Sequence, residues 1–425
     1  MLDIKLIRSN PEKVKAGAKK RCIDVDALVD DILKIDEERR EVTGKVETMK
    51  AEQNAATKKI PLMKKAGEDT ASLMAELKTL SEKIKASDGE LGELEEKQKT
   101  LLLSLPNMPD EDLLAGGKEN NKPIRFYKEQ PKFDFKAKNH VELCESLGMI
   151  DYQRGAKLAG AGSWVYRGMG ARLEWALLNF FISEHLNDGY ELILPPHMLN
   201  YECGYVAGQF PKFTDEVYWI QNPTSTDKKF MLPTAETALV NLHRDEVLTM
   251  EELPRKYIAY TPCYRREAGS YRSEERGMIR GHQFNKVEMV QYTTPEQSDD
   301  AFAELVGKAE KLVQKLGLHY RLSKLAAGDC SFSMARTYDI EVWIPSMEIY
   351  KEVSSASNAR DYQARRGNVK FRGEDKKLQF VHTLNASGLA TSRVIPAIVE
   401  QYQNADGSVT VPEVLRPFMG CDIIK

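Results

Sequence analysis

The chain has 425 residues and a net charge of −3, with 42% hydrophobic and 29% charged residues. One hydrophobic core rarely grows beyond about 250–300 residues, so two globular domains are expected. No apolar run reaches the length of a membrane span. The N-terminus lacks the apolar stretch and cleavage site of a secretory signal, which predicts a cytoplasmic location. Because the total charge is negative, any contact with RNA must come from local basic patches.

The six cysteines are scattered along the chain, at positions 22, 144, 203, 263, 330 and 421. None forms a CxxC pair, and no histidine stands at zinc-ligand spacing from one of them. We therefore expect reduced thiols rather than a metal site or a disulfide framework.

Two apolar repeats dominate the first quarter of the chain. Both alternate spacings of four and three residues, which is typical of a coiled-coil seam. Pro61 and Gly67 interrupt the pattern between the runs, so we predict an antiparallel helical hairpin over residues 27–105, within an N-terminal domain of residues 1–105. Each run would be about 50 Å long. The first consists of Leu28, Ile32, Ile35, Arg39, Val42, Val46, Met49, Gln53, Ala56 and Ile60, and the second of Leu73, Leu77, Leu80, Ile84, Ser87, Leu91, Leu94, Gln98, Leu101 and Leu105.

Four lysines lie near the predicted tip of this hairpin: Lys58, Lys59, Lys64 and Lys65. They could contact the phosphates of a nucleic acid. They could equally be the solvated end of a structural spacer, which is the commoner use of a coiled coil. The sequence at the tip leaves both interpretations open.

Residues 106–134 are predicted to be a linker, because residues 104–123 are rich in proline, glycine, asparagine and acids. Residues 135–425 then form the second domain. Its predicted strands come in adjacent pairs rather than in βαβ units, which indicates an α+β domain with a mainly antiparallel sheet flanked by helices. We expect strands at residues 190–198, 256–264, 282–292, 338–344 and 378–383, and helices at residues 171–185 and 391–403.

The pair of strands at 256–264 and 282–292 carries the strongest chemical signal. If the strands are antiparallel, Arg265, Glu267, Phe284 and Glu288 can share one face, because alternate residues point to the same side. An aromatic ring can stack on a purine, an arginine can bind phosphate, and a glutamate can accept a hydrogen bond from an amine. A surface hairpin with many salt bridges explains the same residues equally well.

Three further clusters have the polar groups of a binding site. Glu352 and Ser355 could hold a metal ion, although such residues near a loop are more often plain polar surface. Arg393 stands at the start of a predicted helix, where an anion is favoured. Thr234 and Glu236 could hold the polar groups of an amino acid. The sequence contains no P-loop, dinucleotide-binding turn or nucleophile elbow.

In this order the clusters resemble the class II aminoacyl-tRNA synthetases, and most closely the bacterial seryl-tRNA synthetase family. GYELILPP is similar to motif 1, YRREAGS with ERGMIRGHQFNKVEMV to motif 2, and LNASGLATSRVIPAIVEQYQ to motif 3. PTAE, TYDIEVWIP, QARR (363–366) and VPEVLRPFMG (411–420) match the seryl family in particular. The long N-terminal hairpin is also typical of it, so the resemblance covers nearly the whole chain.

The resemblance implies a serine–tRNA ligase that uses ATP and Mg²⁺, with L-serine, tRNA(Ser) and tRNA(Sec) as partners. It also implies a homodimer formed through motif 1. Arg265 and Arg393 are the implied catalytic residues, and Glu352 and Ser355 the implied Mg²⁺ ligands. The implied ATP site comprises Arg265, Arg266, Glu267, Arg280, Phe284, Glu352, Val353, Ser354, Ser355 and Arg393. The implied serine site comprises Thr234, Ala235, Glu236, Arg265, Glu288, Asn385 and Ser387, and the tip lysines Lys58, Lys59, Lys64 and Lys65 would bind tRNA.

Two other classes of protein stay open at this point. One is a ligase that activates an amino acid but delivers it to a carrier protein, where a truncated arm would be expected. The other is a coiled-coil interaction protein with a degenerate catalytic domain, which would have lost the charged residues present here. Pyrophosphate exchange followed by tRNA charging separates the three.

Overall fold

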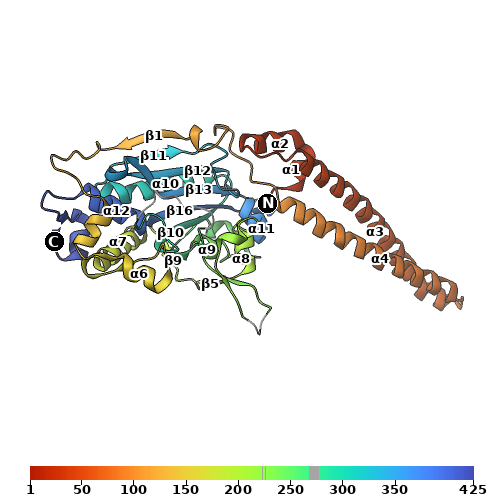
Figure 1. Cartoon of the computed structure of the whole chain (residues 1–425). Coiled ribbons are helices and arrows are strands. Elements are labelled where there is room, and N and C mark those ends of the chain that lie inside the picture. The colour runs from red at the N-terminus through yellow and green to blue at the C-terminus, as the bar shows by residue number, and fades with distance from the viewer. Residues whose placement is uncertain (223, 225, 268–276) are drawn as a thin grey trace. The chain divides into compact units, whose positions relative to one another are not determined.

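The computed structural model describes residues 1–222, 224, 226–267 and 277–425, and it divides into two compact units (Figure 1). One unit comprises Leu2–Lys19 and Ile23–Pro106. The other comprises Met1, Lys20–Cys22 and Asn107–Lys425. All six cysteines are free thiols, as expected. Among the described residues, every helix is too short or too polar to cross a membrane.

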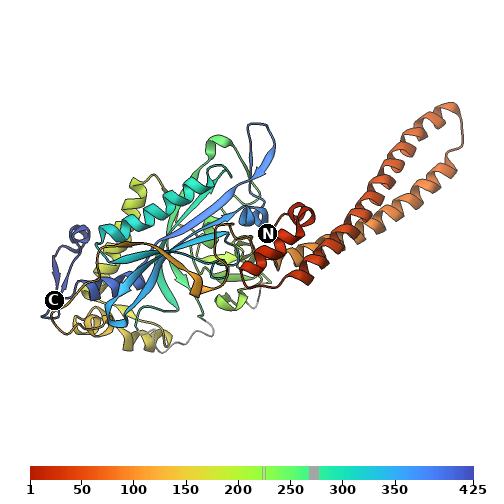
Figure 2. The ribbon, with the colours of Figure 1, turned by 90° about the horizontal axis from the view of Figure 1, so that it is seen from above.

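The N-terminal unit is a helical hairpin. Short helices α1 (Ile4–Ser9) and α2 (Pro11–Lys20) precede the long helices α3 (Asp26–Ala66) and α4 (Ala71–Leu103), which lie side by side (Figure 2). The residues of both predicted seams are buried or half-buried, whereas most of their neighbours are exposed. The coiled-coil pattern was therefore sufficient to predict the contact surface of both helices.

Pro61 does not end the first long helix, so this part of the prediction was wrong. Helix α3 continues past it to Ala66 and ends where Gly67 adopts a left-handed conformation with φ +75°. A proline inside a helix removes one backbone hydrogen bond. Residues 57–59, one turn earlier, are mostly exposed, so water can satisfy the carbonyl that loses its partner. Only the glycine supplies the backbone conformation that stops the helix.

The larger unit is built on an eight-stranded sheet with the order β1-β11-β12-β13-β16-β10-β9-β4. All neighbouring pairs are antiparallel except β4 with β9. This confirms the predicted antiparallel architecture. The strands are β1 (Lys122–Tyr127), β4 (Glu191–Leu192), β9 (Arg255–Tyr264), β10 (Gln283–Thr293), β11 (Tyr320–Lys324), β12 (Arg336–Ile344), β13 (Ile349–Arg360) and β16 (His382–Ala390).

Three helices cover one face of this sheet: α7 (Gly168–Asn187), α10 (Ser298–Lys315) and α12 (Thr391–Gln401). Their apolar side chains form one core with Val287 and Met289 of β10 and with Leu384 and Ala386 of β16. Because side chains alternate along a strand, the residues between these positions point to the opposite face. That opposite face carries the candidate site.

The remaining elements are short. The helices are α5 (His140–Ser146), α6 (Tyr152–Ala159), α8 (Tyr201–Val206), α9 (Glu236–Leu239), α11 (Tyr362–Gly367) and α13 (Arg416–Met419). The strands are β2 (Ile150–Asp151), β3 (Val165–Tyr166), β5 (Met198–Asn200), β6 (Trp219–Ile220), β7 (Lys229–Met231), β8 (Val247–Leu248), β14 (Lys370–Arg372), β15 (Leu378–Phe380), β17 (Val409–Thr410) and β18 (Ile423–Ile424).

Several predicted boundaries differ from the structure. The segment predicted as a linker contains β1, which pairs with β11 at the edge of the large sheet, where Pro123 is tolerated. The strand predicted at 190–198 is reduced to β4, because Pro195 and Pro196 cannot donate to a sheet. The strand predicted at 378–383 is split into β15 and the start of β16. In the predicted loop at 265–281, residues 268–276 of the motif 2 segment lie outside the described residues.

Candidate active site

The antiparallel pairing of β9 and β10 places an aromatic ring beside a guanidinium group. Phe284 is opposite Cys263 and Glu288 is opposite Ala259, so Phe284 and Glu288 belong to the same face of the sheet. Arg265 follows β9, and its guanidinium carbon lies 5.2 Å from the centre of the Phe284 ring. The structure therefore brings Arg265 and Phe284 together, as the alternation predicted.

These two residues line a small cavity of about 50 Å³ between β10, β13, β16 and the start of α12. The cavity is rich in arginine and glutamate and contains one aromatic ring. Its lining is Arg265, Glu267, Ile279, Arg280, Gly281, Phe284, Lys286, Glu352, Val353, Ser387, Ala390, Ser392 and Arg393. Residues that are more than 120 positions apart in the sequence thus form one site.

Two of the three arginines that line the cavity are paired with carboxylates of its own lining, whereas Arg265 donates to the carbonyl of Pro233. The Arg280 guanidinium donates to Glu267 over 2.6 Å. Arg393, in the first turn of α12, lies 3.4 Å from the Glu352 carboxylate and donates to the Glu352 carbonyl over 2.9 Å. These ion pairs neutralise the two guanidinium groups, which can also bind phosphate through charge-assisted hydrogen bonds.

Lys286, a buried residue of the cavity lining, contacts two polar residues. The Lys286 ammonium donates to the Thr234 hydroxyl over 2.8 Å and lies 2.5 Å from the Glu288 carboxylate. Asn385 donates to the other oxygen of Glu288 over 3.2 Å. Lys286 is 6% exposed and Glu288 only 1%. The ion pair and its hydrogen bonds compensate for the burial of both charges.

Glu236, at the start of α9, has a strongly shifted pKa. Burial and the nearby charge of Glu288 raise the pKa of Glu236 to about 7, although Gln363, Lys286 and Arg265 act in the opposite direction. At neutral pH this carboxyl group is consequently poised between its two protonation states. A cationic ligand group beside it would favour the ionised form.

A wider cavity of about 680 Å³ adjoins the first one and shares Ile279, Glu352 and Arg393 with it. Ser355 faces this cavity and donates to Asp339 over 2.7 Å. Burial and the charge of Glu352 raise the pKa of Asp339. Two carboxylates and a hydroxyl are the hard oxygen donors that Mg²⁺ prefers when phosphate supplies its other ligands, so the residues fit this ion.

Each of the two units matches the model of a known protein family. Residues 1–109 match the model "Seryl-tRNA synthetase N-terminal domain", and residues 218–402 match "tRNA synthetase class II core domain (G, H, P, S and T)". "Serine--tRNA ligase 2" of Clostridium acetobutylicum is 61% identical over 99% of this chain and 100% of its own length. "Serine--tRNA ligase" of Kosmotoga olearia is 46% identical over the full length of both chains.

The chain belongs to the seryl-tRNA synthetase family. The members of this family are aminoacyl-tRNA ligases. That the chain belongs to it confirms the predicted resemblance. Two solved structures of the family have the same fold over the whole chain. The seryl-tRNA synthetase of Pyrococcus horikoshii complexed with ATP is 34% identical with a TM-score of 0.92, covering 100% of this chain and 99% of that one. The cytoplasmic serine–tRNA ligase of Naegleria fowleri in complex with AMP is 30% identical with a TM-score of 0.88, with the same coverage.

Seven residues of the predicted seryl-tRNA synthetase site do not line either cavity: Thr234, Ala235, Glu236, Arg266, Glu288, Ser354 and Asn385. Arg266 is exposed, and its guanidinium donates to the carbonyl of Asp215. Ser354 is fully buried and donates to the carbonyl of Ser387 over 2.6 Å within the sheet. Ala235 is buried and has no polar side-chain atom. Only the backbones of Ser354 and Ala235 could contact a ligand.

Sequence reasoning missed Lys286 and Asp339 as parts of this candidate site. Lys286 stands between Phe284 and Glu288 with the same alternation, so the strand pattern alone could have identified it. Asp339 is opposite Ser355 on the neighbouring strand β12. That pairing depends on the register of β12 and β13, which the sequence did not give.

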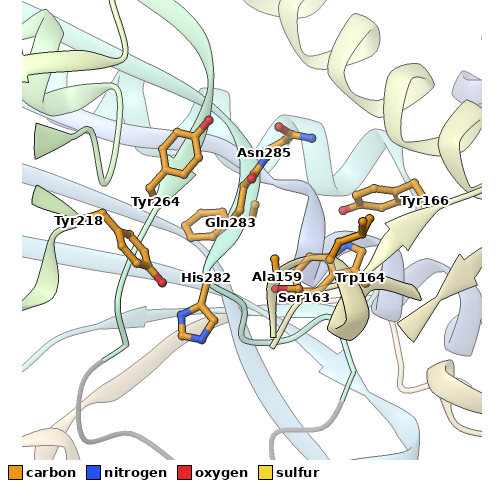
Figure 3. A pocket seen from close by; sticks show the side chains of 12 residues that line it. Ala159, Ser163, Trp164, Tyr166, Tyr218, Tyr264, His282, Gln283 and Asn285 are labelled. Carbon is orange, nitrogen blue, oxygen red and sulfur yellow. The ribbon is translucent and has the colours of Figure 1, made fainter. Parts of the chain in front are cut away.

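A further pocket of about 580 Å³ lies where strand β9 ends and strand β10 begins (Figure 3). Tyr218, Tyr264 and His282 lie on one side of it and Trp164 and Tyr166 on the other. Phe284 is the only residue of the predicted seryl-tRNA synthetase site in its lining. Apart from Phe284, this pocket shares no lining residue with the arginine-rich cavity.

Proposed function

We propose that this chain activates L-serine with ATP to seryl-adenylate and transfers serine to the 3′ end of tRNA(Ser), and also of tRNA(Sec). The observation that carries the proposal is the arginine-rich cavity beside the buried Lys286–Glu288 pair. It combines phosphate-binding and purine-binding groups with a polar pocket for a small amino acid. The names of the relatives support the same reaction.

In this proposal the arginine-rich cavity binds ATP. The Phe284 ring stacks on adenine and Glu267 accepts a hydrogen bond from the adenine amine. Arg265 binds the α-phosphate, while Arg280 and Arg393 bind the outer phosphates. The two related structures, which are complexes with ATP and with AMP, support this assignment.

Glu352 and Ser355 would hold Mg²⁺, with Asp339 orienting the Ser355 hydroxyl through its 2.7 Å hydrogen bond. When bound, Mg²⁺ neutralises charge on the phosphates. Because the Ser355 hydroxyl donates its hydrogen bond to Asp339, the lone pairs of the Ser355 oxygen stay available to a cation.

Serine would bind beside Lys286. The ionised Glu236 holds the α-amino group, and Glu288 accepts a hydrogen bond from the serine hydroxyl. Alanine would leave the buried Glu288 without that partner, at a cost on the order of 1–3 kcal/mol. Thr234, Asn385 and Ser387 complete the proposed pocket.

The chemistry requires positioning and charge neutralisation rather than a protein nucleophile. A carboxylate oxygen of serine attacks the α-phosphorus, and pyrophosphate leaves. A ribose hydroxyl at the 3′ end of the tRNA then attacks the carbonyl carbon of the seryl-adenylate and loses its proton, and AMP leaves. Arg265 can bind the α-phosphate through both steps.

The proposed tRNA contacts lie on the arm, which is the N-terminal helical hairpin. The proposed location of the protein is the cytoplasm. Lys58, Lys59, Lys64 and Lys65 are all exposed at the distal end of the hairpin. They present positive charge to the phosphates of tRNA. No residue of the proposed ATP or serine site lies in this unit.

We also propose a homodimer through motif 1, the segment around the end of α7 and β4. Apolar side chains are exposed here: Leu186 at 45%, Leu194 at 76% and Met198 at 61%. Exposed apolar groups of this kind typically mark a protein interface. A Leu194→Asp variant should sediment as a monomer where the parent chain sediments as a dimer. A parent chain that is already monomeric at micromolar concentration would contradict the proposal.

The decisive test is ATP–pyrophosphate exchange with a panel of amino acids, followed by tRNA charging. Exchange should require serine and Mg²⁺. Arg265→Ala should lower the exchange rate on the order of 100-fold or more, because it removes a charge-assisted contact to the reacting phosphate. Arg266→Ala is the matched control, since its side chain points away from the cavity and its rate should change little.

Stronger exchange with another amino acid would overturn the substrate assignment. Exchange with serine but transfer only to a carrier protein would overturn the tRNA assignment. An unchanged rate in Arg265→Ala would show that the cavity is not the ATP site.

A further inference from the structure

A buried glutamine from α11 contacts the carboxylate that we assign to the amino group of serine. Gln363 is 1% exposed. Its amide nitrogen donates to Glu236 over 2.8 Å and to the carbonyl of Ala207 over 3.0 Å. Its amide oxygen accepts a hydrogen bond from the Thr383 hydroxyl over 2.6 Å. Gln363 thus links β16, α8 and α9 at one point.

The orientation of this amide is fixed by its partners. The Glu236 carboxylate and the Ala207 carbonyl are both acceptors, so the NH₂ group must face them. A rotated amide would direct its oxygen at two acceptors and lose both hydrogen bonds. Thr383 supplies the donor that the amide oxygen needs on the other side. All the hydrogen-bonding groups of Gln363 are therefore in use.

Gln363 is also the only hydrogen-bond donor to the Glu236 carboxylate within the part of the chain that the structure describes. It binds one carboxylate oxygen, Oε1, and leaves the second oxygen for a ligand. We propose that Gln363 is a positioning residue: backed by Thr383, it fixes the Glu236 carboxylate so that its second oxygen receives the α-amino group of the substrate. This inference rests on the proposed function of the serine site.

The same contact influences the ionisation of Glu236. The charged groups that face it are Lys286 and Glu288 from β10 and Arg265 beyond the end of β9. Burial and Glu288 raise the pKa of Glu236, and the Gln363 hydrogen bond lowers it. Loss of that hydrogen bond should raise the pKa further. Serine binding needs the ionised carboxylate. The acid limb of the pH dependence of serine binding should therefore move to higher pH.

The first experiment compares Gln363→Met with the parent chain in serine-dependent pyrophosphate exchange between pH 6 and 9. Methionine keeps the length of the side chain but removes its donors. At pH 7 the serine KM should rise on the order of tenfold, whereas the ATP KM should stay within about twofold. The acid limb of kcat/KM for serine should shift upward by about one pH unit. A general loss of structure would raise both KM values together.

Thr383 provides a matched pair that tests the same chain of hydrogen bonds. Thr383→Ser keeps the hydroxyl donor and should behave like the parent chain. Thr383→Val keeps the shape but removes the donor, so it should raise the serine KM in the same direction as Gln363→Met, by a smaller factor. If Gln363→Met does not fold, as judged by circular dichroism, this pair decides the question.

An unchanged serine KM and pH profile in folded Gln363→Met would overturn the inference, and so would equal increases in the serine and ATP KM values. Equal behaviour of Thr383→Val and Thr383→Ser would overturn it as well. These outcomes are distinguishable from failure of the proposed function, because that failure would appear in the parent chain as exchange that does not depend on serine.

Discussion

At the scale of single residues, Glu288 is a buried charge in the pocket that we propose for serine. Its oxygens face two donors, the Lys286 ammonium at 2.5 Å and the Asn385 amide at 3.2 Å. A carboxylate accepts hydrogen bonds only, so it satisfies both donors and still has lone pairs for a substrate hydroxyl. The residue is almost completely buried, so any mismatch carries the full cost of desolvation.

Glu288→Gln should therefore reduce serine affinity at least tenfold and lower the free energy of unfolding by about 1–3 kcal/mol. Whichever way the new amide is oriented, its NH₂ group meets either Lys286 or Asn385. Isothermal titration with serine and urea denaturation measure the two effects. Glu374→Gln, at an exposed position, is the control. Serine affinity equal to that of the parent chain would remove Glu288 from the pocket.

At the scale of secondary-structure elements, one carboxyl group joins helix α7 to the two segments that resemble motifs 2 and 3. Glu174 of α7 is 3% exposed. It accepts hydrogen bonds from Asn285 of β10 and from Thr391 at the start of α12, each over 2.7 Å. Asn285 is next to Phe284 in sequence, and Thr391 lies two residues before Arg393. Glu174 thereby ties α7 to strand β10 and helix α12, which carry residues of the proposed ATP site.

Burial raises the pKa of Glu174 from 4.5 to about 7, against the effect of its hydrogen-bond donors. In the unfolded chain the group loses its proton near its ordinary pKa, whereas the folded chain keeps it. The free energy of unfolding should therefore fall as pH rises from about 4.5 to 7, by about 3 kcal/mol for this shift. Glu174→Gln should lack this component. Urea denaturation at pH 5 and pH 8 tests it, and parallel stability changes in both proteins would contradict it.

At the scale of the whole molecule, the division into two units separates the two proposed tasks. The arm is held together by its own seam and by a buried cluster near its base, in which Asp36 accepts from Arg8 of α1 and Gln98 of α4. Farther out, Lys50 pairs with Asp88 across the hairpin. These pairs define which residues of α3 and α4 lie opposite one another. The distal part of the hairpin can therefore be removed while the contacts at its base stay intact.

Deletion of residues 46–90, with Lys45 joined to Leu91 by a short Gly/Ser turn, should leave pyrophosphate exchange unchanged. The tRNA KM should rise on the order of tenfold or more, because phosphate contacts are lost. A variant with Lys58, Lys59, Lys64 and Lys65 changed to Gln keeps the arm and should show a weaker salt dependence of tRNA binding. A deletion variant that charges tRNA as well as the parent chain would make the arm a spacer or a protein-binding element.

The sequence by itself determined the features that depend on local periodicity and on residue type. The 4-3 spacing predicted a stripe of side chains along α3 and α4 that is buried or half-buried in the structure, because a seam repeats every 3.5 residues along one helix. The alternation in β9 and β10 predicted that Arg265 and Phe284 share a face. The chemical character of the motifs predicted the family. None of these inferences needed to know which distant segments meet.

Only the tertiary structure decided the features that depend on contacts between distant segments. Gln363 acquires its role from Glu236 and Thr383, which are 127 and 20 positions away. Asp339 reaches Ser355 through the register of two strands, and β1 became an edge strand in a segment with the composition of a loop. A hydrogen bond is set by positions in space to within fractions of an ångström, and local propensities do not fix such positions. Packing of the whole sheet does.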